Sequence, residues 1–252
     1  MTVVAPRRRP DSPGTHQYAR GRRVTARMVR PPERVSPPLD PCATLPDVWR
    51  RATLPRLEDT PLRIAFDYAD PGSYLTFELL SRWLEPRELD RLHWVPLELH
   101  PPGSPPPDPD DVRWREMTAH LAREAAELEI PFTPPTLVPR TRKALELAQH
   151  ALEAGCFPPL HQALFRAHFV EGRDLGRIDE LVRIAEGVGL DPSQTRTVLG
   201  VDRFRPAIEE HRRGLLDEDV RGTPTLLEGE SRLEGFHGAR KLQIFLNEIG
   251  RT

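Results

Sequence analysis

The sequence predicts an α/β fold in which a mixed sheet is divided by a large α-helical insertion. Apolar residues alternate from Leu62 to Tyr68 and then recur at helical spacing up to Leu84, so a strand is followed directly by a helix. From Asp110 to about Val220 nearly the whole sequence has a helical pattern. Two short apolar runs separated by a turn come next, and an amphipathic segment follows them.

The first half of the sheet is predicted to be two strands joined by a helix. Leu62 to Tyr68 is expected as a buried strand, Asp70-Pro71-Gly72-Ser73 as a tight corner, 73–84 as a helix and 92–99 as the second strand. A strand, helix and strand in this order pair in parallel. The proline-rich segment 101–107 cannot lie inside a central strand or a helix, so it marks a boundary.

The insertion is predicted to consist of successive helices. Asp110 and Asp111 favour a helix start before an apolar pattern that reaches Leu128, and further helices are expected over 140–154, 160–170, 178–188, 193–199 and 204–216. A hairpin over 225–233 and a helix over 239–249 end the chain, so the sheet should be parallel first and antiparallel last. The predicted domain comprises 59–100 and 222–252, with the insertion at 101–221.

Residues 1–58 have a different composition and are predicted to be a disordered extension rich in proline and arginine. A basic arm of this kind can bind nucleic acid. Its arginines are not interleaved with a row of aromatic residues that could stack on bases, so we do not expect nucleic-acid binding.

The composition of the 252-residue chain is ordinary for a globular protein apart from its 29 prolines. No run approaches the roughly 20 apolar residues of a membrane span, and no secretory signal is visible, so we expect a cytoplasmic protein without membrane association. The two cysteines, Cys42 and Cys156, lie far apart in the sequence. We expect no structural disulfide between them in a reducing compartment, and Cys156 is interpreted as a small buried residue.

Four segments together resemble one known family. They are the corner Asp70-Pro71-Gly72-Ser73, the strand end Leu97-Glu98-Leu99-His100-Pro101, the helical run 164–169, and Gly222-Thr223-Pro224-Thr225. From about Leu62 to the C-terminus the chain resembles the DsbA-like thioredoxin superfamily, in particular FrnE-type oxidoreductases. 2-Hydroxychromene-2-carboxylate isomerases and kappa-class glutathione transferases are related to them. The resemblance implies a thioredoxin-like mixed sheet.

The chain departs from this family at the reactive position. The resemblance implies that Asp70 stands where oxidoreductases have the first cysteine of Cys-x-x-Cys, or where isomerases and kappa transferases have a serine that faces glutathione. Ser73 stands where the second cysteine is expected. A helix N-terminus lowers the pKa of a thiol, but this corner contains no sulfur. The sequence therefore predicts the shape of the family site without its dithiol.

Asp70 and Ser73 are the candidate catalytic residues. Asp70 before Pro71 also suits a helix N-cap worth about 1 kcal/mol, the interpretation we favour, and a role as general base is compatible with it. Ser73 has no histidine near it in the sequence, so it is not an activated nucleophile on this evidence. A carboxylate at this position would repel a glutathione thiolate, which disfavours activation of glutathione.

The candidate binding residues come from three parts of the chain. They are Pro71, Gly72, Tyr74, Thr141, Thr223 and Pro224. The resemblance implies a cis-proline at Pro224, which would leave the backbone of Thr223 able to pair with an extended peptide. It also implies that Thr141 faces the site. Arg140, Arg142 or Lys143 could bind a ligand carboxylate, although solvated surface charge is the simpler interpretation. The histidines have no metal-ligand spacing, and no metal site is expected.

Three functions remain open. The first is binding of a peptide thiol or a small polar substrate between the Asp70 corner and the Thr223-Pro224 loop, without dithiol turnover. The second is a glutathione-dependent isomerase or transferase, suggested by the resemblance of Ser73-Tyr74-Leu75 to that branch, which would make glutathione a cofactor. The third is a chaperone or interaction protein that keeps only the peptide-binding groove.

Overall fold

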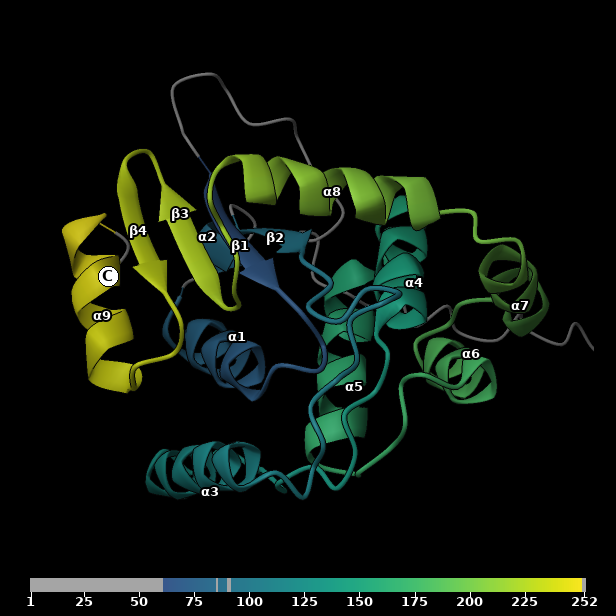
Figure 1. The fold of residues 1–252 in the computed structure, drawn as a ribbon. Coiled ribbons are helices and arrows are strands. Elements are labelled where there is room, and N and C mark those ends of the chain that lie inside the picture. Colours follow the sequence, from purple (N-terminus) through teal and green to yellow (C-terminus); the bar gives the residue numbers. More distant parts are fainter. Residues whose placement is uncertain (1–60, 85, 90–91, 251–252) are drawn as a thin grey trace, which may run out of the picture. The chain divides into compact units, whose positions relative to one another are not determined.

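The computed structural model describes residues 61–84, 86–89 and 92–250, which belong to one compact unit. The predicted extension over 1–58 lies outside the described residues. The elements are β1 (Leu62–Phe66), α1 (Pro71–Trp83), α2 (Pro86–Leu89), β2 (Leu92–Pro96), α3 (Val112–Glu127), α4 (Arg142–Glu153), α5 (Phe157–Phe169), α6 (Ile178–Gly187), α7 (Pro192–Gly200), α8 (Arg205–Asp217), β3 (Thr225–Glu228), β4 (Ser231–Glu234) and α9 (Ala239–Glu248) (Figure 1).

The described strands form a mixed sheet in the order β2-β1-β3-β4. β1 pairs with β2 in parallel, with Leu62 opposite Leu92, and pairs with β3 in antiparallel, with Ile64 opposite Leu226. β3 and β4 form the antiparallel hairpin. The predicted order of parallel and antiparallel pairing is confirmed, and the four-residue corner after β1 lies beside a central strand of the sheet.

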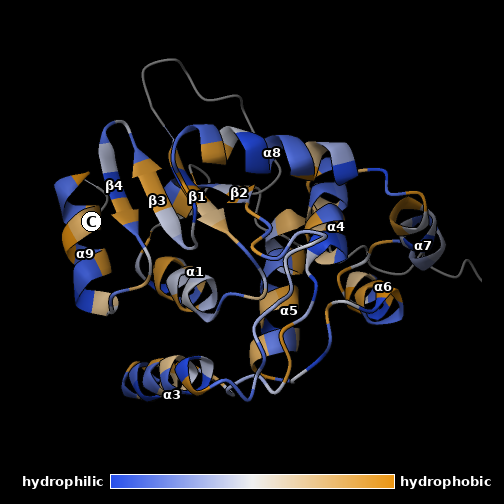
Figure 2. Cartoon of the chain, viewed as in Figure 1, coloured by the Kyte–Doolittle hydropathy of each residue, from blue (hydrophilic) through white to orange (hydrophobic). Residues whose placement is uncertain are grey.

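Alternate residues of β1 enter different cores because successive side chains of a strand point to opposite faces. Ile64 and Phe66 belong to the large cluster that includes residues of α1 and α9, whereas Ala65 packs in a smaller cluster with Leu215 of α8. Figure 1 accordingly shows the strands between α8 on one side and α1 on the other. In Figure 2, α8 presents mostly hydrophilic residues, while hydrophobic residues gather along β3 and α5.

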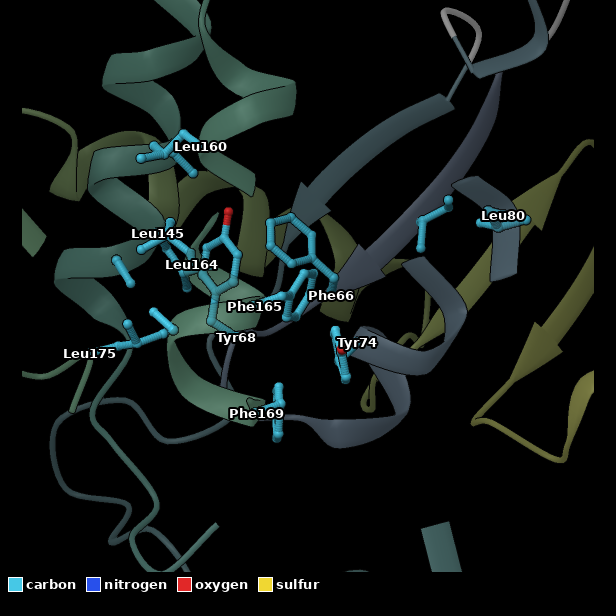
Figure 3. Close-up of a cluster of buried hydrophobic side chains, with 14 of the residues drawn as sticks. Phe66, Tyr68, Tyr74, Leu80, Leu145, Leu160, Leu164, Phe165, Phe169 and Leu175 are labelled. Atoms are coloured by element: carbon cyan, nitrogen blue, oxygen red, sulfur yellow. The ribbon is translucent and has the colours of Figure 1, made fainter. Parts of the chain in front are cut away.

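The helices α3 to α8 lie between β2 and β3 in the sequence, where the insertion was predicted. Aromatic side chains join this block to the sheet: the rings of Phe66 and Tyr68 contact Phe165 of α5 at centroid distances of 6.4 and 4.9 Å (Figure 3). The Tyr68 hydroxyl is hydrogen-bonded to His161 Nδ1 at 2.8 Å. Burial lowers the pKa of His161 well below its ordinary value, so this histidine is a neutral packing residue, as predicted.

The structure differs from the sequence prediction in several details. β1 ends at Phe66 instead of Tyr68, because the chain turns at Asp67, whose carboxylate accepts a hydrogen bond from the N–H of Ala69. The short helix α2 was not predicted. Among the described helices, none combines the length and the apolar character that crossing a membrane requires.

The prediction for Cys156 is only partly right. Cys156 is buried, with 3 % of its surface exposed, at the N-cap position of α5. The expectation that it forms no disulfide is wrong, because its sulfur is disulfide-bonded. Cys42, the other cysteine of the sequence, lies outside the described residues.

Candidate functional site

The corner after β1 is built around the carboxylate of Asp70, the N-cap residue of α1. Asp70 has extended backbone angles, Oδ1 accepts a hydrogen bond from the N–H of Gly72 at 3.1 Å, and Oδ2 accepts one from the N–H of Ser73 at 2.8 Å. Pro71 follows at the first helical position, where it needs no hydrogen-bond partner. The predicted helix cap is therefore confirmed, and the carboxylate occupies the positive end of α1.

Ser73 is hydrogen-bonded to the Asp70 carboxylate and is itself buried, so a ligand cannot contact it. Its side chain has no exposed surface, and its hydroxyl donates to Asp70 Oδ2 at 2.7 Å. The N–H of Asp67 lies 3.5 Å from the same hydroxyl oxygen, at the long limit of a hydrogen bond. Ser73 thus orients the carboxylate, and no catalytic contact of this residue with a ligand is supported by the geometry.

The Thr223-Pro224 loop meets the corner from the far end of the sequence. The peptide bond between these residues is cis. A Cβ atom placed on Gly72 would lie 3.0 Å from Pro224 Cδ and 3.1 Å from Phe236 Cβ, so a larger residue here would require these neighbours to shift. The nearby Thr223 hydroxyl also lowers the pKa of Asp70. Its oxygen is buried and has no hydrogen bond of good geometry in the described part of the chain.

Asp70 is partly exposed and carries opposing influences on its ionisation. Burial is the largest, and it raises the pKa of the carboxyl above its ordinary value because the charged form loses hydration. The hydroxyls of Ser73 and Thr223 and the N–H groups of Ser73 and Gly72 act in the opposite direction. None of these influences is a cation, so the charge of Asp70 is stabilised by hydrogen bonds and by the N-terminus of α1 without a positively charged side chain.

Asp67 is a residue of this site that sequence reasoning missed. It is fully buried, and its oxygens accept hydrogen bonds from the N–H of Ala69 at 3.0 Å and from the N–H of Leu99 at 2.7 Å. Burial, followed by the charge of Asp70, raises the pKa of Asp67 to about 6, against the effect of its hydrogen bonds. Asp67 lies within the run that was interpreted as a strand, and the only sequence feature that distinguishes it there is a charged residue among apolar ones.

Thr141 reaches the site through Asp67. It is the N-cap residue of α4 and 2 % exposed, yet its side chain makes no capping hydrogen bond with its own helix. Its hydroxyl instead lies close enough to Asp67 to lower the pKa of that carboxyl. Thr141 thus lies near Asp67, and no contact of its side chain with Asp70 is seen among the described residues.

Tyr74 does not belong to the corner. Its hydroxyl donates to the carbonyl oxygen of Pro131 at 2.7 Å, and its ring stacks on Phe169 with 5.3 Å between centroids (Figure 3). This tyrosine packs α1 against the insertion, so its predicted contact with a ligand is not supported by the geometry.

Two of the three cationic side chains near Thr141 form ion pairs with acidic residues. Arg142 is paired with Glu98 and, at 2.8 Å, with Glu209. Lys143 is paired with Glu146 at 3.1 Å and with Asp202. Arg140 is exposed, and its guanidinium lies 3.4 Å from the carbonyl oxygen of His100. Arg140 is thus the better placed of the three to meet a ligand carboxylate.

Other features of the described residues do not add to the site. No group of three or more His, Cys, Asp or Glu side chains in this part could hold a metal ion. Two surface hollows of about 290 Å³ lie elsewhere: one includes Pro109, Arg115 and Pro135, the other Gln162, Arg166 and Arg183. Asp70, Ser73 and Thr223 line neither of them.

Comparison with known proteins places this geometry in a family. Residues 62–250 match the family model described as DSBA-like thioredoxin domain. Among curated proteins, the uncharacterized protein YwbO of Bacillus subtilis is 25 % identical over 183 residues, which cover 70 % of this chain and 90 % of YwbO.

Solved structures show the same fold at low sequence identity. The probable DsbA oxidoreductase SCO1869 from Streptomyces coelicolor has a TM-score of 0.62 at 20 % identity, covering 77 % of this chain and 92 % of its own. A 2-hydroxychromene-2-carboxylate isomerase has a TM-score of 0.61 at 20 % identity, covering 75 % and 94 %. The cytosolic disulfide reductase DsbM from Pseudomonas aeruginosa, solved with GSH, has a TM-score of 0.54 at 17 % identity, covering 76 % and 100 %. With its sheet, insertion and proline loop in this arrangement, the chain belongs to the DSBA-like thioredoxin domain family.

Proposed function

We propose that this protein binds a peptide thiol or a small polar substrate between the Asp70 corner and the Thr223-Pro224 loop, without dithiol redox turnover. The observation that carries the proposal is the close approach of the Thr223-Pro224 loop to the N-terminus of α1, where the Asp70 carboxylate is partly exposed. Family membership supports it, because oxidoreductases of this family react at the corresponding corner.

Asp70 supplies an acceptor where a family oxidoreductase would supply a thiolate. Two N–H groups and the Ser73 hydroxyl hold the carboxylate in place, so it can accept a hydrogen bond from a bound thiol, hydroxyl or amine. Burial raises its pKa, which makes it a stronger base than an exposed aspartate. Positions 70 and 73 contain no cysteine, so this corner cannot exchange a dithiol for a disulfide.

The loop offers a backbone edge to a ligand. Within the described residues, the N–H and C=O of Thr223 make no hydrogen bond, whereas the carbonyl of the next residue, Pro224, accepts one from Gly235 at 2.7 Å. An extended peptide could pair with these free groups of Thr223 in the manner of an added strand. This supports a peptide ligand, whether it is a substrate or a client of a non-catalytic binding protein.

A glutathione-dependent isomerase or transferase has weaker support. The Ser73 hydroxyl is buried and donates to Asp70, so it is not available to a glutathione sulfur. Asp70 would in addition repel a thiolate. Neutral glutathione remains a useful probe, since it is both a thiol and a peptide.

Calorimetry with reduced glutathione and with a short cysteine-containing peptide tests the proposal. We expect at least one of them to bind the wild type, with affinity lost in D70N and reduced in T223V. D111N is the matched control, because Asp111 caps α3 through the N–H groups of Arg113 and Trp114 as Asp70 caps α1. Equal binding by wild type and D70N, or brisk insulin reduction by the wild type, would refute the proposal.

A further inference from the structure

Asp67 joins three segments that are distant in the sequence. Its carboxylate accepts hydrogen bonds from the N–H of Ala69 in the corner and from the N–H of Leu99 beyond β2, and the nearby Thr141 hydroxyl at the beginning of α4 lowers its pKa. No part of the Asp67 side chain is exposed. Burying a carboxylate costs free energy unless hydrogen bonds compensate for the lost hydration. These hydrogen bonds must therefore be kept, which fixes the positions of the segments that donate them.

These segments form the support of the Asp70 carboxylate. The carbonyl of Asp67 accepts the N–H of Asp70 at 3.1 Å, which closes the turn that presents Asp70. The Ser73 hydroxyl lies between the Asp67 N–H and Asp70 Oδ2. Asp67 and Asp70 are therefore linked through this turn and this hydroxyl.

The charged groups around Asp67 are few. Tyr68 and Asp70 lie in the turn that follows β1. The charge of Asp70 raises the pKa of Asp67, and the charge of Asp67 raises that of Tyr68. Glu98, next to Leu99, and Arg142, next to Thr141, are paired with each other. Asp67 thus has hydrogen bonds but no cationic partner among the groups that most affect its pKa.

We infer that Asp67 is the positioning residue of this site: it holds the corner, the end of β2 and the beginning of α4 in the arrangement that presents Asp70 to a ligand. The inference rests on the proposed function. An ionised Asp67 accepts from both N–H groups. In a protonated Asp67 one oxygen becomes a hydroxyl, which is a weaker acceptor, so one of these contacts weakens and we expect ligand affinity to fall as the pH is lowered through about 6.

The test compares D67N with E146Q, a matched control in which the removed charge is also fully buried but lies farther along α4, beside Lys143. Each variant is titrated with reduced glutathione by calorimetry at pH 7.5 and 5.0. The amide NMR signals of Ala69 and Leu99 are followed over the same range. These two signals report on Asp67 without any ligand.

In the wild type we expect both amide signals to shift with a common midpoint near pH 6, and we expect D67N to abolish this shift while E146Q retains it. D67N should weaken glutathione binding about tenfold at pH 7.5 and remove its pH dependence, as the loss of a hydrogen bond to a charged group predicts. E146Q should bind like the wild type. If D67N does not fold, T141V should weaken binding in the same direction while keeping the charge.

Two results would overturn the inference. One is a folded D67N that binds glutathione with wild-type affinity and wild-type pH dependence, which would make Asp67 a purely structural residue. The other is the absence of a pH-dependent amide shift in the wild type. If neither glutathione nor the cysteine-containing peptide binds the wild type at all, the proposed function fails. The amide titration then still shows whether the Asp67 carboxylate accepts hydrogen bonds from Ala69 and Leu99.

Discussion

The ionisation of Asp67 predicts an unusual pH dependence of stability. Its pKa is about 6 in the folded protein and 3.8 ordinarily, so the folded state binds this proton more tightly than the unfolded chain. Stability from this group is therefore fully present below the unfolded pKa and is lost as the pH rises through 6. One unit of pKa shift corresponds to about 1.4 kcal/mol, so the difference between the folded and unfolded pKa of Asp67 corresponds to about 3 kcal/mol of stability. About 2 kcal/mol of this stability is gained between pH 7.5 and 4.5.

Urea unfolding of the wild type and D67N at a series of pH values measures this contribution. Many other groups titrate in the same range, but they are common to both proteins and cancel in the difference between the two free energies of unfolding. We expect the wild type to gain about 2 kcal/mol on D67N as the pH falls from 7.5 to 4.5. A difference that does not change with pH, or that changes in the opposite direction, would refute the reasoning about this buried carboxyl.

Three further predictions concern the corner. The double substitution D70C/S73C places two thiols at a helix N-terminus facing the proline loop, so we expect it to reduce insulin with dithiothreitol while the wild type does not; an inactive, folded double variant would contradict a thioredoxin-like geometry. D70A should lower the free energy of unfolding by about 1 kcal/mol through loss of the helix cap, and so should D111A, its counterpart on α3, as measured by urea unfolding; only D70A should affect ligand binding. G72A should destabilise by about 1–3 kcal/mol, because its Cβ would lie 3.0 Å from Pro224, whereas an unchanged melting temperature would show that this contact yields easily.

The candidate site shows where sequence reasoning is sufficient. An aspartate followed by a proline specifies a helix start through contacts within four residues, and Asp70 caps α1 as predicted. The prediction that the Thr223-Pro224 loop approaches this corner came from the family resemblance. Nothing local to either segment indicates that they meet.

The roles of the neighbouring residues could not be predicted, because they depend on long-range packing. Ser73 and Tyr74 are adjacent, yet the first donates to Asp70 and the second to Pro131, and only the position of the insertion decides which face of α1 is covered. The sequence left Arg142 available to a ligand, whereas in the fold this arginine is ion-paired with Glu98 and Glu209.

The sequence by itself determined the strand, the corner, the helical insertion and the closing hairpin, because hydrophobic period and turn chemistry act over short stretches of chain. Only the tertiary structure decided that Asp67 is a buried acid hydrogen-bonded to Leu99 and close to Thr141, and that Asp70 remains partly exposed near Thr223. Burial and hydrogen bonding set the ionisation of a carboxyl, and both arise when distant segments pack together.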